Sequence, residues 1–289
     1  MPMVYLSQFS LPSQDSREDA LRAAVNNRTC FNNYYPFHVF DNWEEVTLSF
    51  APITVFYGGN GSGKTTLLNL IGEKLKLERR SDFNRASFFQ DFVDLCRCES
   101  RRVPADSRVL TSDDVFDDLL DLRALNQGVD RERADLLAEY KILRYEGFQM
   151  TALEDYDQLK KVVRAKRKGS SASAYARQAI GGNVRGKSNG ETAFRYFTNQ
   201  IQENALYLLD EPENSLSAQY QQELAKFLED SARFFHCQIL LSTHSPFLLA
   251  MKGAKVYDLD RQPIQETKWT DLPNVRVWHA FFQAHEDEF

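Results

Sequence analysis

One run of residues constrains the fold of this chain more than any other feature: Gly58-Gly59-Asn60-Gly61-Ser62-Gly63-Lys64-Thr65. It has the G-x-x-x-x-G-K-[ST] spacing of a phosphate-binding loop (P-loop). The apolar stretch Ile53 to Tyr57 precedes it, and residues 66–71 follow with a helix-forming pattern. Strand, glycine-rich loop and helix form the context in which this motif binds phosphate. The sequence therefore predicts an α/β fold with a nucleoside-triphosphate site.

Each residue type in the loop has a physical role in that prediction. Glycine lets backbone N–H groups converge on phosphates, where a side chain would block the approach. The Lys64 ammonium can reach the β- and γ-phosphates, the Thr65 hydroxyl can join the shell of a Mg²⁺ ion, and the helix start adds partial positive charge. The residues from which we expect contacts to the nucleotide are Gly58, Asn60, Gly61, Ser62, Gly63, Lys64, Thr65 and Thr66.

Length and composition place the chain among soluble globular proteins. Its 289 residues, 43% hydrophobic and 26% charged, are enough for one large α/β domain with an insertion. No apolar stretch has the length of a membrane-spanning helix, and the first residues lack the pattern of a signal peptide. We therefore expect a cytoplasmic protein without membrane insertion.

The order of patterns along the chain predicts the domain organisation. Strand-like segments come first, and helical periodicity dominates from Thr111 to Lys168, where Thr111–Asp114 and Thr151–Glu154 resemble capping boxes. Leu136, Leu137, Tyr140 and Leu143 indicate a further helix after the first one. Buried-strand runs then alternate with helices again. We expect a single domain over 1–289 with a mostly parallel sheet, N-terminal antiparallel strands and a helical insertion with a basic loop at 91–190.

Charge is segregated along that insertion, although the net charge of the chain is −6. Asp and Glu are frequent from Asp113 to Glu139, whereas Lys160 to Lys187 holds nine Lys and Arg residues and no acid. Such a stretch could neutralise the phosphates of DNA or RNA without reading sequence, or it could be a solvated loop. Both interpretations stay open.

Two acidic residues follow directly after an apolar run. Residues 205–209 read as a buried parallel strand, and Asp210 and Glu211 come next. Ligands of open α/β sheets bind at the carboxyl ends of the strands. We expect Asp210 to orient Mg²⁺ and Glu211 to position and polarise an attacking water.

A histidine follows the next predicted strand. Residues 238–241 read as another buried strand, and Ser242-Thr243-His244-Ser245 comes after them. The strand end places His244 beside the same edge of the sheet, where it could contact the γ-phosphate or hold the water.

Taken together, these motifs resemble the ATP-binding-cassette (ABC) superfamily of P-loop NTPases. The match covers the P-loop at 58–65, the acidic pair at 210–211, the D-loop-like Glu213-Asn214-Ser215-Leu216-Ser217 and the switch histidine at 244. The resemblance implies a Mg-ATP-hydrolysing enzyme that dimerises on ATP, with ATP and Mg²⁺ as its ligands.

The resemblance also assigns residues that act across the dimer. Lys187-Ser188-Asn189-Gly190-Glu191 lies just upstream of the acidic strand, where the family places its signature sequence. There Ser188, Gly190 and Glu191 would face the γ-phosphate held by a second protomer, at the start of a helix. Gln90 is the candidate for the family's Mg²⁺-sensing glutamine. Tyr35, Phe37 and Phe40 are the candidates for stacking on adenine.

Departures from the transporter pattern favour one branch of this superfamily. The signature is not Leu-Ser-Gly-Gly-Gln, and Ser217 stands where transporter D-loops usually have aspartate. Ser-x-Gly-Glu looks more like soluble members in DNA repair and antiphage defence, which engage nucleic acid or control a separately encoded effector. The alternatives are the ATPase subunit of an ABC membrane transporter, a nuclease or toxin using acids such as Asp258 and Asp260, and a P-loop kinase.

Overall fold

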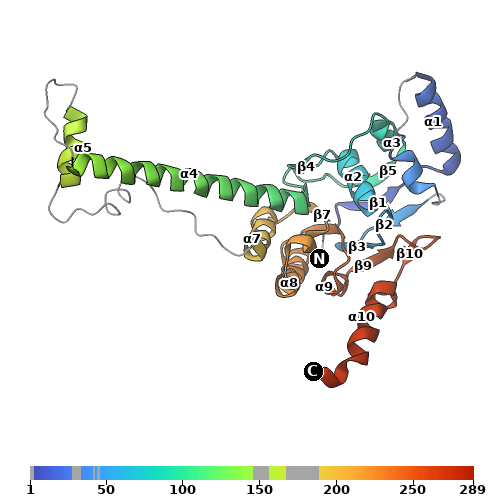
Figure 1. Ribbon diagram of the computed structural model, residues 1–289. Helices are drawn as coiled ribbons and strands as arrows, with labels where there is room; N and C mark the ends of the chain where they lie inside the picture. The colour runs from blue at the N-terminus through green and yellow to red at the C-terminus, as the bar shows by residue number, and fades with distance from the viewer. Residues whose placement is uncertain (1–2, 28–33, 42, 44–45, 146–155, 167–188) are drawn as a thin grey trace. The chain divides into compact units, whose positions relative to one another are not determined.

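The chain divides into two compact units (Figure 1). The computed structural model describes residues 3–27, 34–41, 43, 46–145, 156–166 and 189–289. Unit 1 comprises Met1–Phe116 and Ser188–Phe289, and unit 2 comprises Asp117–Lys187. The sequence predicted an insertion from residue 91. The helical unit instead begins at Asp117, because two strands of unit 1 lie between these positions.

A seven-stranded sheet forms the centre of unit 1, in the order β10-β9-β3-β8-β7-β6-β4. Its strands are β3 (Ile53–Tyr57), β4 (Glu78–Arg79), β6 (Arg108–Thr111), β7 (Leu206–Asp210), β8 (Gln238–Ser242), β9 (Lys255–Asp258) and β10 (Gln265–Glu266). Every neighbouring pair is parallel except β10 with β9. The prediction of an α/β P-loop NTPase fold with a mostly parallel sheet is confirmed.

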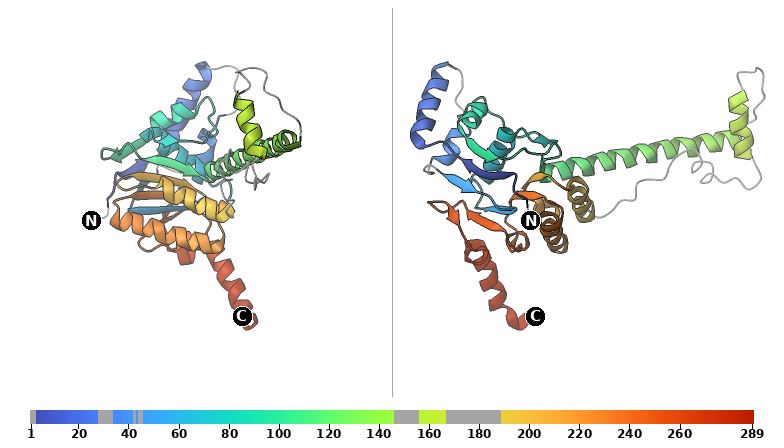
Figure 2. Two further views of the ribbon diagram at one scale, coloured as in Figure 1. Left: turned by 90° about the vertical axis from the view of Figure 1, so that its left-hand side faces the viewer. Right: turned by 180° about the vertical axis from the view of Figure 1, so that it is seen from behind.

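Helices cover both faces of this sheet. β3 leads into α2 (Lys64–Leu75) and on to β4 at one edge, whereas β7 leads through α8 (Ala218–Phe234) back to β8. Right-handed crossovers that run in opposite directions put their helices on opposite faces, as the left view of Figure 2 shows. All residues of β3 and β8 are therefore buried. The carboxyl ends of β3, β7 and β8 meet at one edge.

A second, antiparallel sheet confirms the predicted N-terminal strands. Its order is β2-β1-β5, formed by β1 (Leu6–Ser10), β2 (Thr47–Ser49) and β5 (Arg97–Ser100). The remaining helices of unit 1 are α1 (Gln14–Asn27), α3 (Phe89–Leu95), α7 (Asn189–Gln200), α9 (Pro246–Leu249) and α10 (Pro273–Ala284). No helix in the described part of the chain is both long and apolar enough to cross a bilayer.

The β-branched and aromatic residues around Phe37 to Phe50 predict one or two strands; β2 is one of them, whereas Phe37–Phe40 is a 3₁₀ helix. Its two phenylalanine rings pack on Phe92 of α3. The buried guanidinium of Arg17 on α1 donates to the carbonyl oxygens of Phe40 and Trp43 and holds the turn. Hydrogen bonds to a distant residue thus hold this segment in a turn, although its residue types favour a strand.

Unit 2 contains a helical hairpin. α4 (Ser112–Tyr145) is one helix of 34 residues, so the prediction of two helices in this region was wrong. α5 (Tyr156–Lys166) packs against the end of α4 through Tyr140, Leu143, Val162 and Ala165. The second expected capping box, at 151–154, lies outside the described residues.

The first expected capping box is confirmed at the start of α4. The Asp114 backbone N–H donates to Thr111 Oγ1, and the Thr111 N–H donates to Asp114 Oδ2 at 2.7 Å. This reciprocal pair satisfies backbone donors that the first turn of a helix leaves open.

One link between the two sheets of unit 1 is the fully buried amide side chain of Gln238 on β8. Its Oε1 accepts from the backbone N–H groups of Tyr5 and Leu6, at 2.7 and 2.8 Å. Its Nε2 donates to the carbonyl oxygen of Leu6 at 2.8 Å. Gln238 therefore continues the hydrogen bonding of the central sheet into β1.

We expect Gln238→Leu to lower the free energy of unfolding by about 2–5 kcal/mol, because it leaves two buried N–H donors unsatisfied. Urea denaturation measures this. Gln219→Leu, on the exposed face of α8, is the control and should stay within about 0.5 kcal/mol of wild type. Equal stability of the two variants would show that Gln238 does not join the sheets.

Candidate nucleotide-binding site

The P-loop lies between β3 and α2, as the sequence predicts. Its backbone conformation and close packing require glycine at two positions. Gly61 and Gly63 adopt positive φ angles of 82° and 91°. A Cβ on Gly63 would also come within 3.1 Å of the side chains of Val39 and Phe40. The loop can therefore bring its backbone close to a ligand only with glycine at these positions.

A pocket of about 240 Å³ opens over this loop, lined by residues 60–66 together with Val39 and Glu211. All predicted P-loop residues except Gly58 line it. The Gly58 carbonyl oxygen instead accepts from Lys64 Nζ at 2.8 Å. Ser62 also lines the pocket, and its buried hydroxyl has no hydrogen-bond partner among the described residues.

Lys64 is the buried cation of the site, with 5% of its side chain exposed. Its ammonium donates to the Gly58 and Gly59 carbonyl oxygens and lies 2.9 Å from His244 Nε2. It also lies 3.5 Å from Glu211 Oε1. A phosphate that bound here would compete with these oxygen and nitrogen atoms for the Lys64 ammonium.

Asp210, at the end of β7, accepts two hydroxyl hydrogen bonds at one carboxylate oxygen. Thr65 donates to Oδ1 at 3.1 Å, and Ser242, at the end of β8, donates to the same atom at 2.5 Å. Burial raises the pKa of Asp210, and these two hydrogen bonds oppose that rise. The carboxylate and the Thr65 hydroxyl are thus held next to each other at the mouth of the P-loop.

Glu211 has a strained backbone and an ionised side chain. Its φ of 45° lies in the left-handed region that non-glycine residues rarely adopt. The hydrogen bond from His244 lowers the pKa of its carboxyl to about 2, with further help from Asn214 and the charge of Lys64. Asn214 Nδ2 donates to Oε2 at 3.1 Å. Glu211 is therefore an anion at neutral pH, aimed at Lys64.

His244 completes the predicted group at the end of β8. Its Nε2 lies 2.9 Å from Lys64 Nζ and 3.4 Å from Glu211 Oε1. A neutral imidazole can accept from the lysine there, whereas a protonated one can donate to the carboxylate. The structure thus brings the predicted Lys64, Glu211 and His244 together.

Sequence reasoning did not assign roles to several residues that build this edge. The Glu213 carboxylate accepts the His244 backbone N–H at 2.5 Å, and its Oε2 is buried without a hydrogen-bond partner in the described part of the chain. Burial raises the pKa of Glu213. Asp260, after β9, accepts the Gly59 N–H at 2.7 Å and so fixes the first turn of the P-loop. Acids at strand ends were the only available signal for both.

Tyr57, the last residue of β3, connects the P-loop with α10. Its ring meets that of His244 edge to face at 6.2 Å, and its hydroxyl oxygen accepts the Asn274 backbone N–H at 3.3 Å. Asn274 lies in the first turn of α10. Tyr57 therefore contacts both His244 and α10.

The three aromatic candidates for adenine stacking are placed differently. Phe37 and Phe40 are buried in the core and present no face to a ligand. The Tyr35 ring stacks on Phe89, and its hydroxyl is hydrogen-bonded to Thr66 Oγ1 at 3.0 Å. Val39 is the residue of this segment that lines the pocket.

The remaining predicted residues do not line the pocket. Gln90 lies on the exposed side of α3 and donates to Asp94 Oδ1 at 2.8 Å. Ser188 lies outside the described residues. Gly190 and Glu191 are in the first turn of α7, where Gly190 packs closely on Tyr220 and Glu191 lies 4.0 Å from Arg195.

The donor set fits Mg²⁺ with a triphosphate. The ion prefers hard oxygen ligands, and the Asp210 carboxylate and Thr65 hydroxyl are adjacent oxygens beside the loop that would hold the phosphates. The partnerless Ser62 hydroxyl and the buried Lys64 ammonium are suited to phosphate oxygens.

Two segments of the chain match family models of ATPases. Residues 32–90, with the P-loop, match a family described as AAA domain. Residues 189–249, with the acidic pair and the histidine, match one described as AAA ATPase domain. The chain thus carries AAA-type ATPase segments on both sides of unit 2. No protein of curated function matches the sequence.

Solved structures with low sequence identity also match. A dimeric bacterial ABC transporter cassette is 14% identical, with a TM-score of 0.35 over 80% of this chain and 91% of its own. The Smc head domain of Pyrococcus furiosus, bound to the C-terminal domain of ScpA, is 13% identical, with a TM-score of 0.44 over 97% and 100%. The SMC head domain of Thermotoga maritima is 11% identical, with a TM-score of 0.36 over 88% and 94%.

We expect Lys64→Ala to weaken ATP binding about 10- to 100-fold, because a buried charge-assisted contact to phosphate contributes about 1.5–3 kcal/mol. Titration of a fluorescent ATP analogue measures this. Lys226→Ala, at an exposed position of α8, should bind like wild type. Unchanged affinity of Lys64→Ala would place the nucleotide elsewhere.

Proposed function

We propose that this chain is a Mg²⁺-dependent ATPase that forms a head-to-tail dimer on ATP, with each site completed by the neighbour's signature segment, residues 188–191. One observation carries the proposal. Lys64, an ionised Glu211 and His244 lie within 3.5 Å of one another, beside a pocket formed by the P-loop.

The residues of the site explain how hydrolysis would proceed. A γ-phosphate entering the pocket draws Lys64 away from Glu211, which removes one cause of the low pKa of that carboxyl. Glu211 then accepts a hydrogen bond from the attacking water, and His244 donates to a phosphate oxygen. Mg²⁺ held by Thr65 and Asp210 would offset the charge on the phosphates.

The signature segment supports a dimer. Gly190 and Glu191 begin α7, whose N-terminus suits an anion, yet neither lines the pocket of its own chain. The resemblance to ABC proteins assigns these positions to the partner's γ-phosphate. A second copy supplies that phosphate.

We expect Glu211→Gln to lower ATP turnover at least about 100-fold while leaving ATP binding in place, because the water loses its acceptor. With excess Mg-ATP the variant should accumulate in the ATP-driven dimer, measured by light scattering as a rise in mass over the nucleotide-free protein. Glu223→Gln, on α8, is the control for loss of one carboxylate. A Glu211→Gln protein that stays monomeric with Mg-ATP, or that hydrolyses ATP normally, contradicts the proposal.

The biological setting that we propose is DNA repair or phage defence, through nucleic acid or a separately encoded effector. The signature and D-loop departures from transporters support it, as does the basic stretch Lys160–Lys187. Of that stretch, Lys160, Lys161 and Lys166 lie exposed on α5, and Lys161 pairs with Glu139 at 2.8 Å. Its residues 167–187 lie outside the described residues.

The acids considered for a nuclease have structural roles instead. Asp258 is buried and lies 3.1 Å from Arg261, and Asp260 holds the Gly59 N–H. Asp260 therefore supports the P-loop, and Asp258 accepts the Asp260 N–H at 3.1 Å, which favours the ATPase proposal over a nuclease centred on them.

We expect DNA to raise ATP turnover several-fold at low salt, and the effect to vanish when Lys160, Lys166, Arg167 and Lys168 are changed to Gln, because phosphate contacts depend on these charges. Steady-state hydrolysis with and without DNA measures this. The control changes Lys226 and Arg233 of α8 to Gln. If ATP turnover does not respond to DNA, a protein effector would be the partner that controls the ATPase.

A further inference from the structure

The last helix of the chain has an apolar stripe that its own unit does not cover. α10 begins beside the sheet and extends away from it (Figures 1 and 2). Val277, Phe281 and Phe282 are 65%, 56% and 56% exposed. At helical spacing these residues and Trp278 share one side of α10, and apolar side chains gathered in this way mark interaction surfaces.

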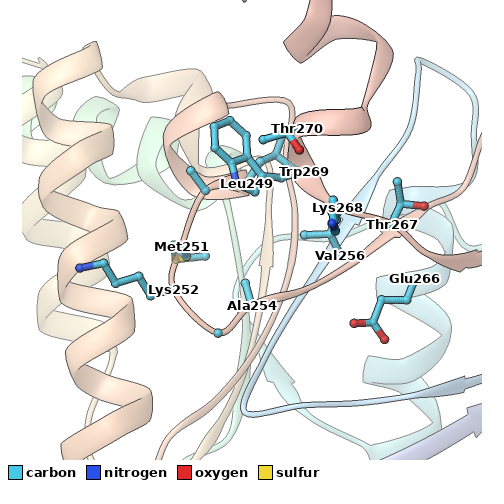
Figure 3. A pocket seen from close by; sticks show the side chains of 12 residues that line it. Leu249, Met251, Lys252, Ala254, Val256, Glu266, Thr267, Lys268, Trp269 and Thr270 are labelled. Atoms are coloured by element: carbon cyan, nitrogen blue, oxygen red, sulfur yellow. The ribbon is translucent and has the colours of Figure 1, made fainter.

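A pocket of about 610 Å³ lies at the base of this helix. Trp269 is its main exposed apolar wall, Leu249, Met251 and Val256 lie beneath with at most 4% of their surface exposed, and Figure 3 shows Lys252 and Lys268 on opposite sides of Leu249 and Met251. Trp269 is only partly covered, with 37% of its surface exposed. An aromatic side chain would fill such a space with little loss of conformational entropy.

Charge at the two surfaces is complementary. The last turn after α10 carries Glu286, Asp287 and Glu288, all exposed. Within the described ranges, neither the Lys252 nor the Lys268 ammonium has a carboxylate partner. Glu266, the acid of the pocket, lies 3.5 Å from Lys255. The pocket rim is therefore basic toward an incoming acidic segment.

The helix cannot fill the pocket of its own chain. Trp269–Asp271 is the turn that leads into α10, so Phe281 and Phe282 lie about ten residues, or about 15 Å of helix, beyond the pocket wall. A straight helix cannot turn back on its own base. The apolar stripe of α10 can therefore reach such a pocket only on another molecule.

We propose that α10 pairs antiparallel with α10 of a second copy, so that Phe281 and Phe282 enter the pocket at the base of the partner's helix. A two-fold axis brings the outer end of each helix to the base of the other. The turn 286–288 then faces the partner's Lys252 and the partner's Lys268. The same contacts occur twice and the assembly closes as a dimer.

This interface requires no nucleotide and is separate from the ATP-dependent one. The first test is therefore light scattering of the full chain without ATP or Mg²⁺, in wild type and in Lys64→Ala. Both should be dimers. A monomer at micromolar concentration in both proteins overturns the inference.

The side chains are tested by a matched pair of variants. Phe281→Ser/Phe282→Ser should weaken dimerisation at least about 100-fold, because buried aromatic anchors dominate small interfaces. Phe234→Ser/Phe235→Ser, at the exposed last residue of α8 and the residue after it (59% and 49%), should remain dimeric. An intact dimer in the first variant, or loss of the dimer only in the second, overturns the inference.

Charge reversal tests the pairing of the acidic turn with the lysines. Lys252→Glu/Lys268→Glu and Glu286→Lys/Glu288→Lys should each weaken the dimer, and combining all four changes should restore it. Failure of the combination to restore dimerisation contradicts the charge pairing.

Cross-linking tests the antiparallel arrangement. A mixture of Phe282→Cys and Thr270→Cys chains should form disulfides between the two variants. Cross-links only between two Phe282→Cys chains would show a parallel pair and overturn the geometry.

The ATP-driven dimer is examined independently in Phe281→Ser/Phe282→Ser/Glu211→Gln. There the mass should rise only on addition of Mg-ATP. Each interface can therefore fail without affecting the test of the other.

Discussion

The buried ammonium of Lys64 is the interaction on which the edge of the central sheet depends. A cation removed from water needs carbonyl and carboxylate partners, and here it has the carbonyl oxygens of Gly58 and Gly59 and the carboxylate of Glu211. These partners come from the ends of β3 and β7, and His244 from the end of β8. The ends of three neighbouring strands therefore meet around one charge.

Much of this edge was predictable from the sequence because its signals are local. The P-loop spacing, the acids after an apolar run and the strand ending at His244 each identify a strand end, and parallel strands bring their carboxyl ends together. The capping box at Thr111 is likewise encoded within four residues. Such features require no knowledge of distant partners.

The features that sequence reasoning missed depend on contacts between distant residues. The 3₁₀ turn at Phe37–Phe40 is held by Arg17, and the sheets are joined by Gln238, more than 230 residues from Leu6. Glu213 and Asp260 look like solvated acids until the fold brings them to His244 and Gly59. The unbroken α4 was missed because the stretch between Leu122 and Leu136 is mostly polar and contains Gly128, which reads as a break between two helices.

Tyr57 has a consequence for how the two proposed interfaces relate. It directly precedes the P-loop, meets the His244 ring and accepts a hydrogen bond from the first turn of α10. If both proposals hold, nucleotide binding and α10 pairing would therefore act on the same residue from two sides. Thermodynamic reciprocity then applies: if α10 pairing changes the affinity for ATP by some factor, ATP changes the affinity of α10 pairing by the same factor.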